Sequence, residues 1–406
     1  MGATNIAELI DDCLYNILEF LTTKDRISFA QVSQRFRQVF INQCGSKYRE
    51  FTLDENSRRL ELIQLCICRE AVEVLTINLE HFDTGKCMGT SYRCIAPAEC
   101  YGILCHTLSG MNRLKHLVVK QLKFYIAPID KPFDQVLAAV RHLPELKRLE
   151  FQATQDFSVD RLHQLQNLET LQLLIPKVPP ACLVKCFKSN SNLRSLHLGY
   201  SCCQKNLVDI IVTHCKDLEV LKFGMTAEPA DYKPLAKLPK LRELSHFGIR
   251  RSGSFEPLLS SLAVKSQLKH LSIDGGSLTQ GEVCQLVCIQ SLRHLTCFCA
   301  SNECVEMLGR LKNLEEICLW MSRPLDISHG LLTIIASCKR LKLLRLAVGN
   351  VNKNFFNDAI DLLRMDERLG QQPPLKLEIP AISQKQDISH EDISIHKERI
   401  IWGSVA

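Results

Sequence analysis

Cysteine and histidine side chains are the groups of this sequence best suited to chemistry, since the chain holds 20 Cys and 13 His among its 406 residues. A strong structural zinc site needs paired Cys-x-x-Cys spacings, and clusters such as Cys297-x-Cys299 lack that spacing. The best candidate nucleophile is Cys215, two residues before Asp217, but it ends an expected helix, where a thiol behaves as a small hydrophobe. Phosphate-loop, Gly-x-Ser-x-Gly and His-Glu-x-x-His patterns are missing from the sequence. We therefore expect no metal, no cofactor and no catalytic residue.

Charge and hydropathy restrict the compartment and the class of partner. The N-terminus carries Glu8, Asp11 and Asp12 instead of a basic region followed by an apolar one, so no secretory signal is indicated. No run of about 18 apolar residues could span a bilayer. The net charge of +6 is spread over the chain without a basic run. We expect a cytoplasmic or nuclear protein with reduced thiols, and neither nucleic acid nor membrane as a partner.

The pattern Leu-x-x-Leu-x-Leu, or a near copy, recurs along most of the chain. From Leu146 onward, eight consecutive intervals run from 22 to 27 residues. A fixed period in this range indicates leucine-rich repeats, which cannot bury their apolar sides alone and must stack. The repeats start at Leu114, Leu146, Leu168, Leu193, Leu218, Leu241, Leu268, Leu292, Leu314 and Leu341.

Each repeat is expected to hold a short strand, a polar loop and an amphipathic helix. In the unit that starts at Leu314, the strand residues Ile317 and Leu319 are followed by Leu331, Ile334 and Ile335 at helical spacing. The predicted fold class is α/β: three N-terminal helices followed by a curved solenoid, with parallel strands inside and helices outside.

The period breaks at both ends of the array. We expect a helical linker at 46–71 and a solenoid of about 11–12 repeats at 72–379, with an inserted loop near 81–113 that is rich in Gly, Thr, Ser and Cys. Residues 380–406 are polar with isolated apolar residues and are interpreted as a C-terminal tail.

The first 45 residues form a different region. Asp11 and Asp12 can cap a first helix, Thr23 can begin a second, and Ser33 can cap a third. Chains of fewer than about 40 residues seldom fold alone, so three short helices with this much apolar surface indicate a partner.

The motif in these helices resembles the F-box. It departs from the usual pattern at Ile10, where Pro is common, at Asp12, where Glu is common, and at Phe36, where the aromatic residue is commonly Trp. An F-box followed by leucine-rich repeats resembles the leucine-rich-repeat class of F-box proteins over nearly the whole chain. The motif segments are Leu9-Ile10-Asp11-Asp12-Cys13-Leu14-Tyr15-Asn16-Ile17-Leu18-Glu19-Phe20-Leu21, Lys24-Asp25-Arg26-Ile27 and Val32-Ser33-Gln34-Arg35-Phe36.

This resemblance implies a non-catalytic substrate receptor of an SCF ubiquitin ligase. The F-box would bind the Skp adaptor and, through it, the cullin–RING scaffold, while the repeats would bind a protein substrate. The alternative is a repeat scaffold outside any ligase, whose N-terminal helices act as a cap. The residues expected at the adaptor, or in the packing beneath it, are Leu9, Leu14, Ile17, Phe20, Leu21, Ile27, Val32 and Phe36.

Alternation of side chains along a strand places template positions three, five and seven on the concave face of the expected solenoid. Large aromatic residues there are costly unless covered, and Trp and Arg are frequent in binding hot spots. The alternatives are that a loop or the tail covers these side chains, or that the register is displaced by one residue. The predicted substrate-binding residues are Phe247, His270, His294, Phe298, Trp320 and Arg345.

Overall fold

The computed structural model divides the chain into two compact units, Met1–Leu193 and Arg194–Ala406, each of which is considered by itself. The residues that the structure describes are 6–54, 56–57, 59–82, 97–123, 131–199, 206–224, 232–248, 252–265, 267–323, 325–364, 375–379 and 400–403.

Three helices open the first unit: α1 (Asp11–Phe20), α2 (Thr23–Val32) and α3 (Gln34–Cys44). The expected start of the second helix and the expected cap of the third are confirmed, because Thr22 and Ser33 accept hydrogen bonds from backbone amides in the first turns of α2 and α3. The expected cap of the first helix is wrong: Ile10 is the N-cap and offers no side-chain acceptor, whereas the two aspartates lie in the first turn. Acidic residues in that turn still stabilise the helix, because their negative charge interacts favourably with the N-terminal end of the helix dipole.

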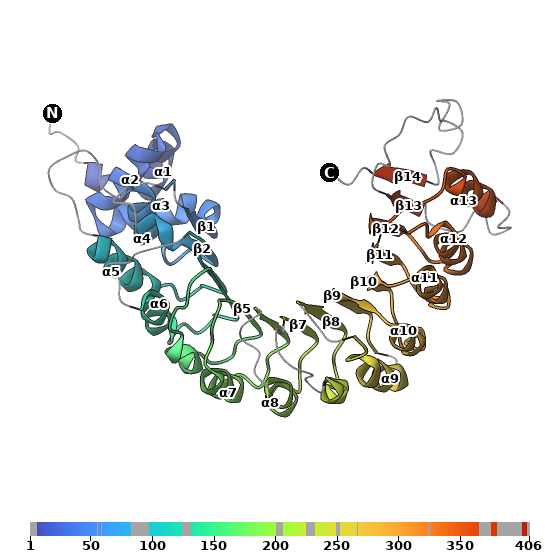
Figure 1. Ribbon diagram of the computed structural model, residues 1–406. Coiled ribbons are helices and arrows are strands. Elements are labelled where there is room, and N and C mark those ends of the chain that lie inside the picture. Colours follow the sequence, from blue (N-terminus) through green and yellow to red (C-terminus); the bar gives the residue numbers. More distant parts are fainter. Residues whose placement is uncertain are drawn as a thin grey trace. The chain divides into compact units, whose positions relative to one another are not determined.

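A parallel sheet follows in the first unit, with helices along one of its faces (Figure 1). A parallel pair needs a crossover connection, and here short helices or 3₁₀ turns make the crossovers. The strands are β1 (Glu50–Leu53), β2 (Val74–Asn78), β3 (His116–Gln121), β4 (Arg148–Ala153) and β5 (Thr170–Leu174). The α-helices are α4 (Arg59–Cys68), α5 (Pro97–Leu108), α6 (Pro132–Val140) and α7 (Pro180–Ser189).

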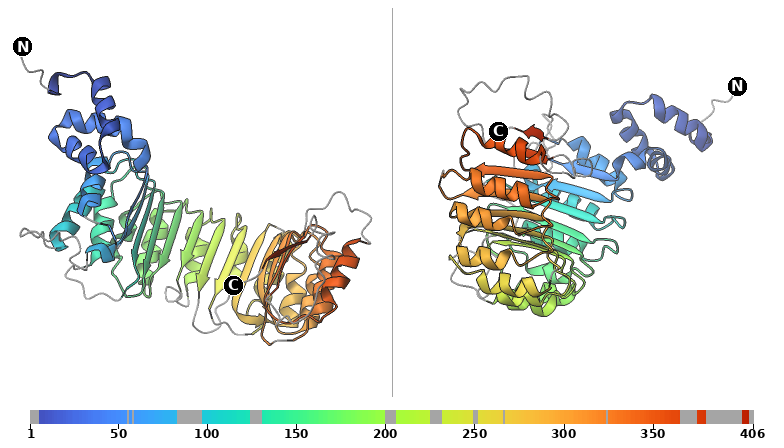
Figure 2. Two further views of the ribbon diagram at one scale, coloured as in Figure 1. Left: turned by 90° about the horizontal axis from the view of Figure 1, so that it is seen from above. Right: turned by 90° about the vertical axis from the view of Figure 1, so that its right-hand side faces the viewer.

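The second unit repeats this arrangement, and its strands run side by side in Figure 2. Its strands are β6 (Ser195–Leu198), β7 (Val220–Gly224), β8 (Glu243–Phe247), β9 (His270–Leu278), β10 (His294–Cys299), β11 (Glu316–Met321), β12 (Leu343–Val348), β13 (Leu375–Glu378) and β14 (Ile400–Gly403). Its α-helices are α8 (Leu207–His214), α9 (Glu256–Lys265), α10 (Gln280–Leu286), α11 (Asn302–Leu308), α12 (Ser328–Ser337) and α13 (Phe355–Arg364).

Burial alternates along the strands as the leucine pattern predicts. In β11, Ile317 and Leu319 are buried, whereas Cys318 and Trp320 are only half-buried. The buried side faces the helices, where the predicted stripe residue Leu331 of α12 is also buried. The predicted class, a three-helix N-terminal region followed by an all-parallel, repeat-like α/β solenoid, is confirmed.

Three segments expected to lie outside the regular repeats contain a strand or a helix that was not predicted. Strand β1 lies in the expected helical linker at 46–71 and pairs with β2, from Glu50 opposite Val74. Helix α5 lies in the expected insert at 81–113, of which 83–96 are outside the described residues. Strand β14 lies in the expected tail and pairs in parallel with β13. These strands were missed because four residues offer too few apolar positions to define a period.

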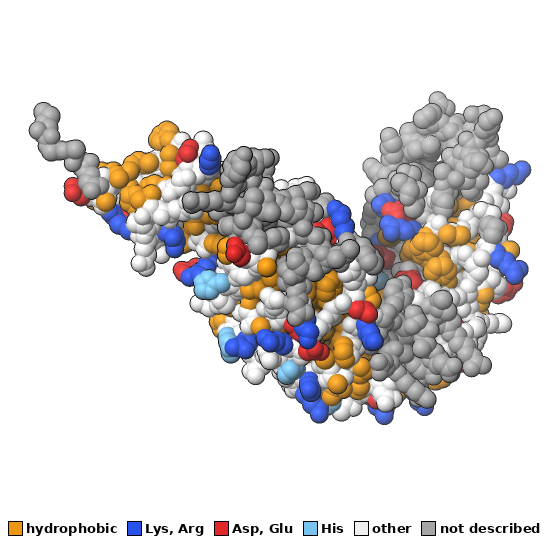
Figure 3. All heavy atoms as spheres, turned by 60° about the vertical axis from the view of Figure 1, so that its left-hand side comes forward, with side chains coloured by type: hydrophobic (Ala, Val, Ile, Leu, Met, Phe, Trp, Pro, Cys, Tyr) orange, Lys and Arg blue, Asp and Glu red, His pale blue; other side chains and the backbone are white. Residues whose placement is uncertain are grey.

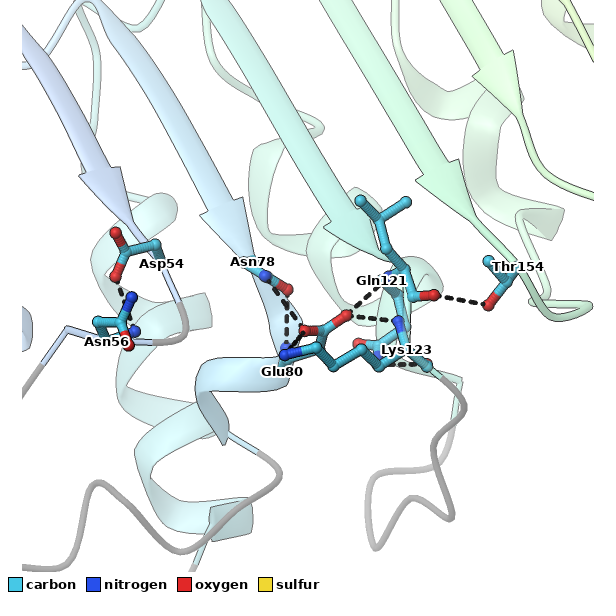
Figure 4. Close-up of polar contacts among 8 residues, drawn as sticks. Asp54, Asn56, Asn78, Glu80, Gln121, Lys123 and Thr154 are labelled. Atoms are coloured by element: carbon cyan, nitrogen blue, oxygen red, sulfur yellow. Dashed lines mark hydrogen bonds and ion pairs between the residues drawn. The ribbon is translucent and has the colours of Figure 1, made fainter.

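A buried carboxylate joins two turns at one end of the first unit's strands (Figure 4). Glu80, which follows β2, accepts hydrogen bonds at Oε1 from the backbone amides of Leu122 at 2.9 Å and Lys123 at 2.5 Å. Asn78 accepts from the amide of Glu80 at 3.1 Å, and Thr154 donates to the carbonyl of Leu122 at 3.3 Å. The contacts hold the ends of β2, β3 and β4 in register.

Candidate protein-binding surfaces

The three N-terminal helices share their core with the first helix of the sheet region. Phe36 stacks on Phe29, with ring centroids 4.5 Å apart and planes 9° apart. Ile67 and Cys68 of α4 belong to the same buried cluster. The helices are therefore completed by α4, and the first 45 residues do not contain their whole core. The members of the cluster from α1 to α3 are Leu14, Leu18, Ile27, Phe29, Ala30, Phe36, Val39, Phe40 and Cys44.

Large apolar side chains remain uncovered on the same helices. Phe20 is 89% exposed, Val32 is 68% exposed and Ile10 is 65% exposed. Figure 3 shows hydrophobic side chains gathered on the surface near the N-terminus. Single exposed apolar residues are common in proteins, but three of this size at the ends of two short helices, α1 and α2, offer apolar surface to a protein partner.

Arginine side chains hold the ends of these helices together. Arg35, in the first turn of α3, donates to the carbonyl oxygens of Ala7 at 2.7 Å and Leu9 at 2.5 Å, and forms an ion pair of 2.7 Å with Asp11. Arg26 of α2 donates to the carbonyl of Leu18 at 2.8 Å. The first of these contacts brings the start of α3 beside the start of α1, so the segments that carry Val32 and Ile10 are neighbours.

The eight predicted adaptor residues divide into three groups. Leu14, Ile27 and Phe36 lie inside the core, and Phe20 and Val32 are exposed. The remaining three are partly buried against the core: Leu9, Ile17 and Leu21. Exposed Ile10 was noted in the sequence only as a departure from the F-box pattern. Its apolar character at a helix start was the signal that could have identified it as a further candidate.

Comparison with known families gives a match to the F-box domain over residues 6–45. The chain carries an F-box domain. At the family level this domain is the adaptor-binding element of SCF-type substrate receptors, which are typically non-catalytic and reach the cullin–RING scaffold through the Skp adaptor. No curated protein matches the chain, and the leucine-rich-repeat class is suggested by the parallel, solenoid-like sheet. No helix in the described part of the chain is long and apolar enough to cross a membrane.

Beyond the F-box, five of the six predicted substrate-binding residues form a half-buried group on the open face of the second unit. Phe298 and Trp320 are opposite each other in β10 and β11, and their rings stack with centroids 5.4 Å apart. His270 and His294 stack on each other at 4.2 Å, and His294 lies four residues before Phe298 on β10. Phe247 packs edge-on against His197 at 5.5 Å. Neither the tail nor a loop within the described residues buries these side chains completely.

The sixth residue, Arg345, is bound within the chain. Its guanidinium pairs with Glu378 of β13, which is almost buried. Arg345, and after it Lys376 at 2.5 Å, hold the pKa of Glu378 below its usual value. The same bond raises the pKa of Arg345. Arg345 consequently anchors β13 to β12 through its Nε–H group.

The histidine pair is electrostatically distinct from the aromatic pair. Burial, followed by the neighbouring His294, lowers the pKa of His270 below its usual 6.5. His294 lies 3.2 Å from a carboxylate oxygen of Glu316. The lowered pKa of His270 favours its neutral form, and the two stacked rings offer a flat surface.

Cys215 and Cys338 have the properties of core residues. Burial raises the pKa of Cys215 to about 12 and that of Cys338 to about 11, so both thiols are protonated at neutral pH. A protonated thiol is a poor nucleophile and a poor metal ligand. Within the described residues no group of three or more His, Cys, Asp or Glu side chains is arranged to hold a metal ion.

Proposed function

We propose that this chain is a substrate receptor of an SCF-type ubiquitin ligase, of the leucine-rich-repeat class, acting in the cytoplasm, the nucleus or both. The F-box domain binds the Skp adaptor, and the open face of β8–β12 binds a protein target. The chain supplies binding and orientation, while a ubiquitin-conjugating enzyme held by the cullin–RING scaffold supplies the chemistry.

The observation that carries the proposal is the match at residues 6–45 together with the exposed Ile10, Phe20 and Val32. The opposite sides of their helices are already filled by the core that α4 completes. The exposed side chains therefore have no remaining role in packing within the described unit. Covering a Phe or Val side chain completely is worth about 1.5–3 kcal/mol, which gives an adaptor contact a physical basis.

For the target, the open face of the second unit combines stacked aromatic rings with polar side chains. Phe298 and Trp320 are half-buried by each other yet keep one side accessible. Trp is the residue most often found in interface hot spots. Because these rings lie on adjacent strands of a rigid sheet, little conformational entropy is lost when a partner covers them.

The adaptor half of the proposal is tested with the full-length chain, because the F-box helices share their core with α4. Phe20→Ala combined with Val32→Ala is expected to weaken binding of purified Skp adaptor about ten-fold or more, with an unchanged melting temperature. Val264→Ala, at a valine of α9 that is 86% exposed, is the matched control and should bind normally. Unchanged adaptor affinity of the double variant would overturn the assignment of this surface.

The alternative function, a repeat scaffold outside any ligase, is favoured by one observation: α2 and α3 pack on α4 and so cover the end of the sheet region. The two functions differ in one measurement. A scaffold whose helices act only as a cap would show no affinity for the Skp adaptor in the wild-type chain, whereas a receptor binds it with or without a target.

A further inference from the structure

A carboxylate without a partner lies on the open face of the second unit. Asp274 of β9 is half-buried, and no hydrogen bond or ion pair joins its carboxylate to the described residues. Burial raises the pKa of Asp274 above its usual value. Buried charges in proteins are normally paired, so this position is unfavourable in the free protein and calls for a functional explanation.

Aromatic side chains flank this carboxylate on the neighbouring strands. Ile273 pairs with Cys297 of β10 and with His246 of β8. The next residue along each of these strands is Asp274 on β9, Phe298 on β10 and Phe247 on β8. Phe298 stacks on Trp320 of β11, whereas the ring of Phe247 lies over Gly224 of β7 on the other side. The carboxylate thus interrupts a row of aromatic rings.

The backbone that carries Asp274 is a β-bulge held in place by close contacts. The register of β9 against β10 shifts directly after this point, between Cys297 and Cys299. Gly275 has φ +85°, and a Cβ there would come within 1.8 Å of the carbonyl oxygen of Gly248. Bulges redirect side chains at functional sites. The hydroxyls of Ser277 and Ser322 also bond to each other, which ties the bulge to the end of β11.

One cation of the described residues on this face, Arg345, already has a partner. Arg345 of β12 lies opposite Cys318 of β11, and its guanidinium is bound to Glu378. An incoming cation would therefore meet Asp274 free. A guanidinium suits a carboxylate flanked by aromatic rings best, because its plane stacks on Trp and Phe rings while its edge donates hydrogen bonds to the carboxylate.

We propose that Asp274, Phe298 and Trp320 form a binding site for an arginine side chain of the target protein. The proposal deepens the proposed function, since it rests on the open face of the second unit as the target-binding surface. The guanidinium stacks on the exposed side of the aromatic pair, and its N–H groups donate to the Asp274 carboxylate. Occupation pairs the charge that is unpaired in the free protein.

The test uses acetyl-arginine-amide as the probe and the indole N–H signals of the full-length chain as the readout. The sequence has two tryptophans, so Trp402→Phe assigns the Trp320 signal. That signal is expected to shift in a saturable manner with acetyl-arginine-amide, and to stay in place with acetyl-citrulline-amide, which has the same shape without the charge. An equal response to citrulline, or none to arginine, would overturn the site. A stronger response to acetyl-lysine-amide would overturn its assignment to arginine.

Variants separate binding from folding. Asp274→Asn should weaken the arginine response about five-fold or more, while the melting temperature stays equal or rises because a desolvated charge is removed. Asp209→Asn, at an exposed aspartate of α8, is the control for net charge and should respond like the wild type. Affinity for the Skp adaptor should be unchanged in both variants. If only the response to the arginine probe is missing, the arginine site is wrong and the adaptor function stands. If the wild-type chain does not bind the Skp adaptor, the proposed function is wrong.

Discussion

The ring of Phe36 lies flat on that of Phe29, with centroids 4.5 Å apart, at the centre of the F-box core. Phe36 occupies the aromatic position of the motif, and it is buried, whereas Phe20 at the end of α1 is almost fully exposed. Two phenylalanines of one small domain thus have opposite roles. Phe36 holds the helices together, and Phe20 is available to a partner.

Truncation of these two residues should separate stability from binding. Phe36→Ala is expected to lower the free energy of unfolding by about 3–5 kcal/mol, because it removes a stacked ring and leaves a cavity. Phe20→Ala should change that free energy by no more than about 0.5 kcal/mol. Urea denaturation of the full-length chain measures both. Equal losses in the two variants would show that Phe20 is covered in solution.

The leucine period predicted the strands and helices of the regular repeats, because one face of the strand is buried in every repeat. The side of each strand that faces the helices followed from the positions of residues such as Leu319 and Leu344, both buried. The strands at the ends could not be found in the same way. β1 contributes only Phe51 and Leu53 to the core, and two apolar residues do not define a period.

Candidate binding residues were harder to separate from core residues. On α1, Leu14 and Leu18 are buried and Phe20 is exposed, although all three are apolar, so residue type alone does not assign roles. Asp274 had no sequence signal, because its significance comes from the bulge and from rings on other strands. Arg345 was identified as a charged residue of the open face, but the sequence did not show that Glu378 would bind it.

The carboxylate that joins the strand ends of the first unit should be essential to local stability. Glu80→Ala removes the acceptor for the amides of Leu122 and Lys123 (Figure 4) and should lower the free energy of unfolding by about 1–3 kcal/mol. Glu80→Gln keeps an acceptor oxygen and should lose roughly half as much. Faster amide exchange at Lys123 in the alanine variant would locate the effect. Equal losses in both variants would point to the charge instead of the hydrogen bonds.

Two glycines of the second unit test whether the bulge is fixed by its surroundings. Gly253 and Gly275 both have positive φ, +79° and +85°, but a Cβ at Gly253 meets nothing within 4 Å. Gly253→Ala should therefore cost about 1 kcal/mol from backbone strain alone. Gly275→Ala adds a clash with the backbone of Gly248 and should cost at least about 2 kcal/mol. Thermal and urea unfolding compare the two, and equal costs would mean that the bulge can move aside.

The histidine pair predicts how stability depends on pH. The pKa of His270 is lowered in the folded chain, so on acidification the unfolded chain takes up this proton first. The stabilisation is present above pH 6.5 and is lost as the pH falls from about 6.5 toward the folded pKa. The neighbouring charges of His294 and Lys269 add to the lowering, whereas the carboxylates of Glu243 and Glu316 oppose it only in part.

Replacing His270 should therefore reduce the loss of stability in mild acid. Between pH 7.5 and 5.5, the urea midpoint of His270→Gln is expected to fall less than that of the wild-type chain. His329→Gln, at an exposed histidine of α12, provides the control and should behave as the wild type does. If His270→Gln and the wild type lose stability in parallel, the stacked pair does not hold the imidazole neutral. If His270→Gln loses more, the folded protein binds the proton more strongly than the unfolded chain, and the sign of the shift is reversed.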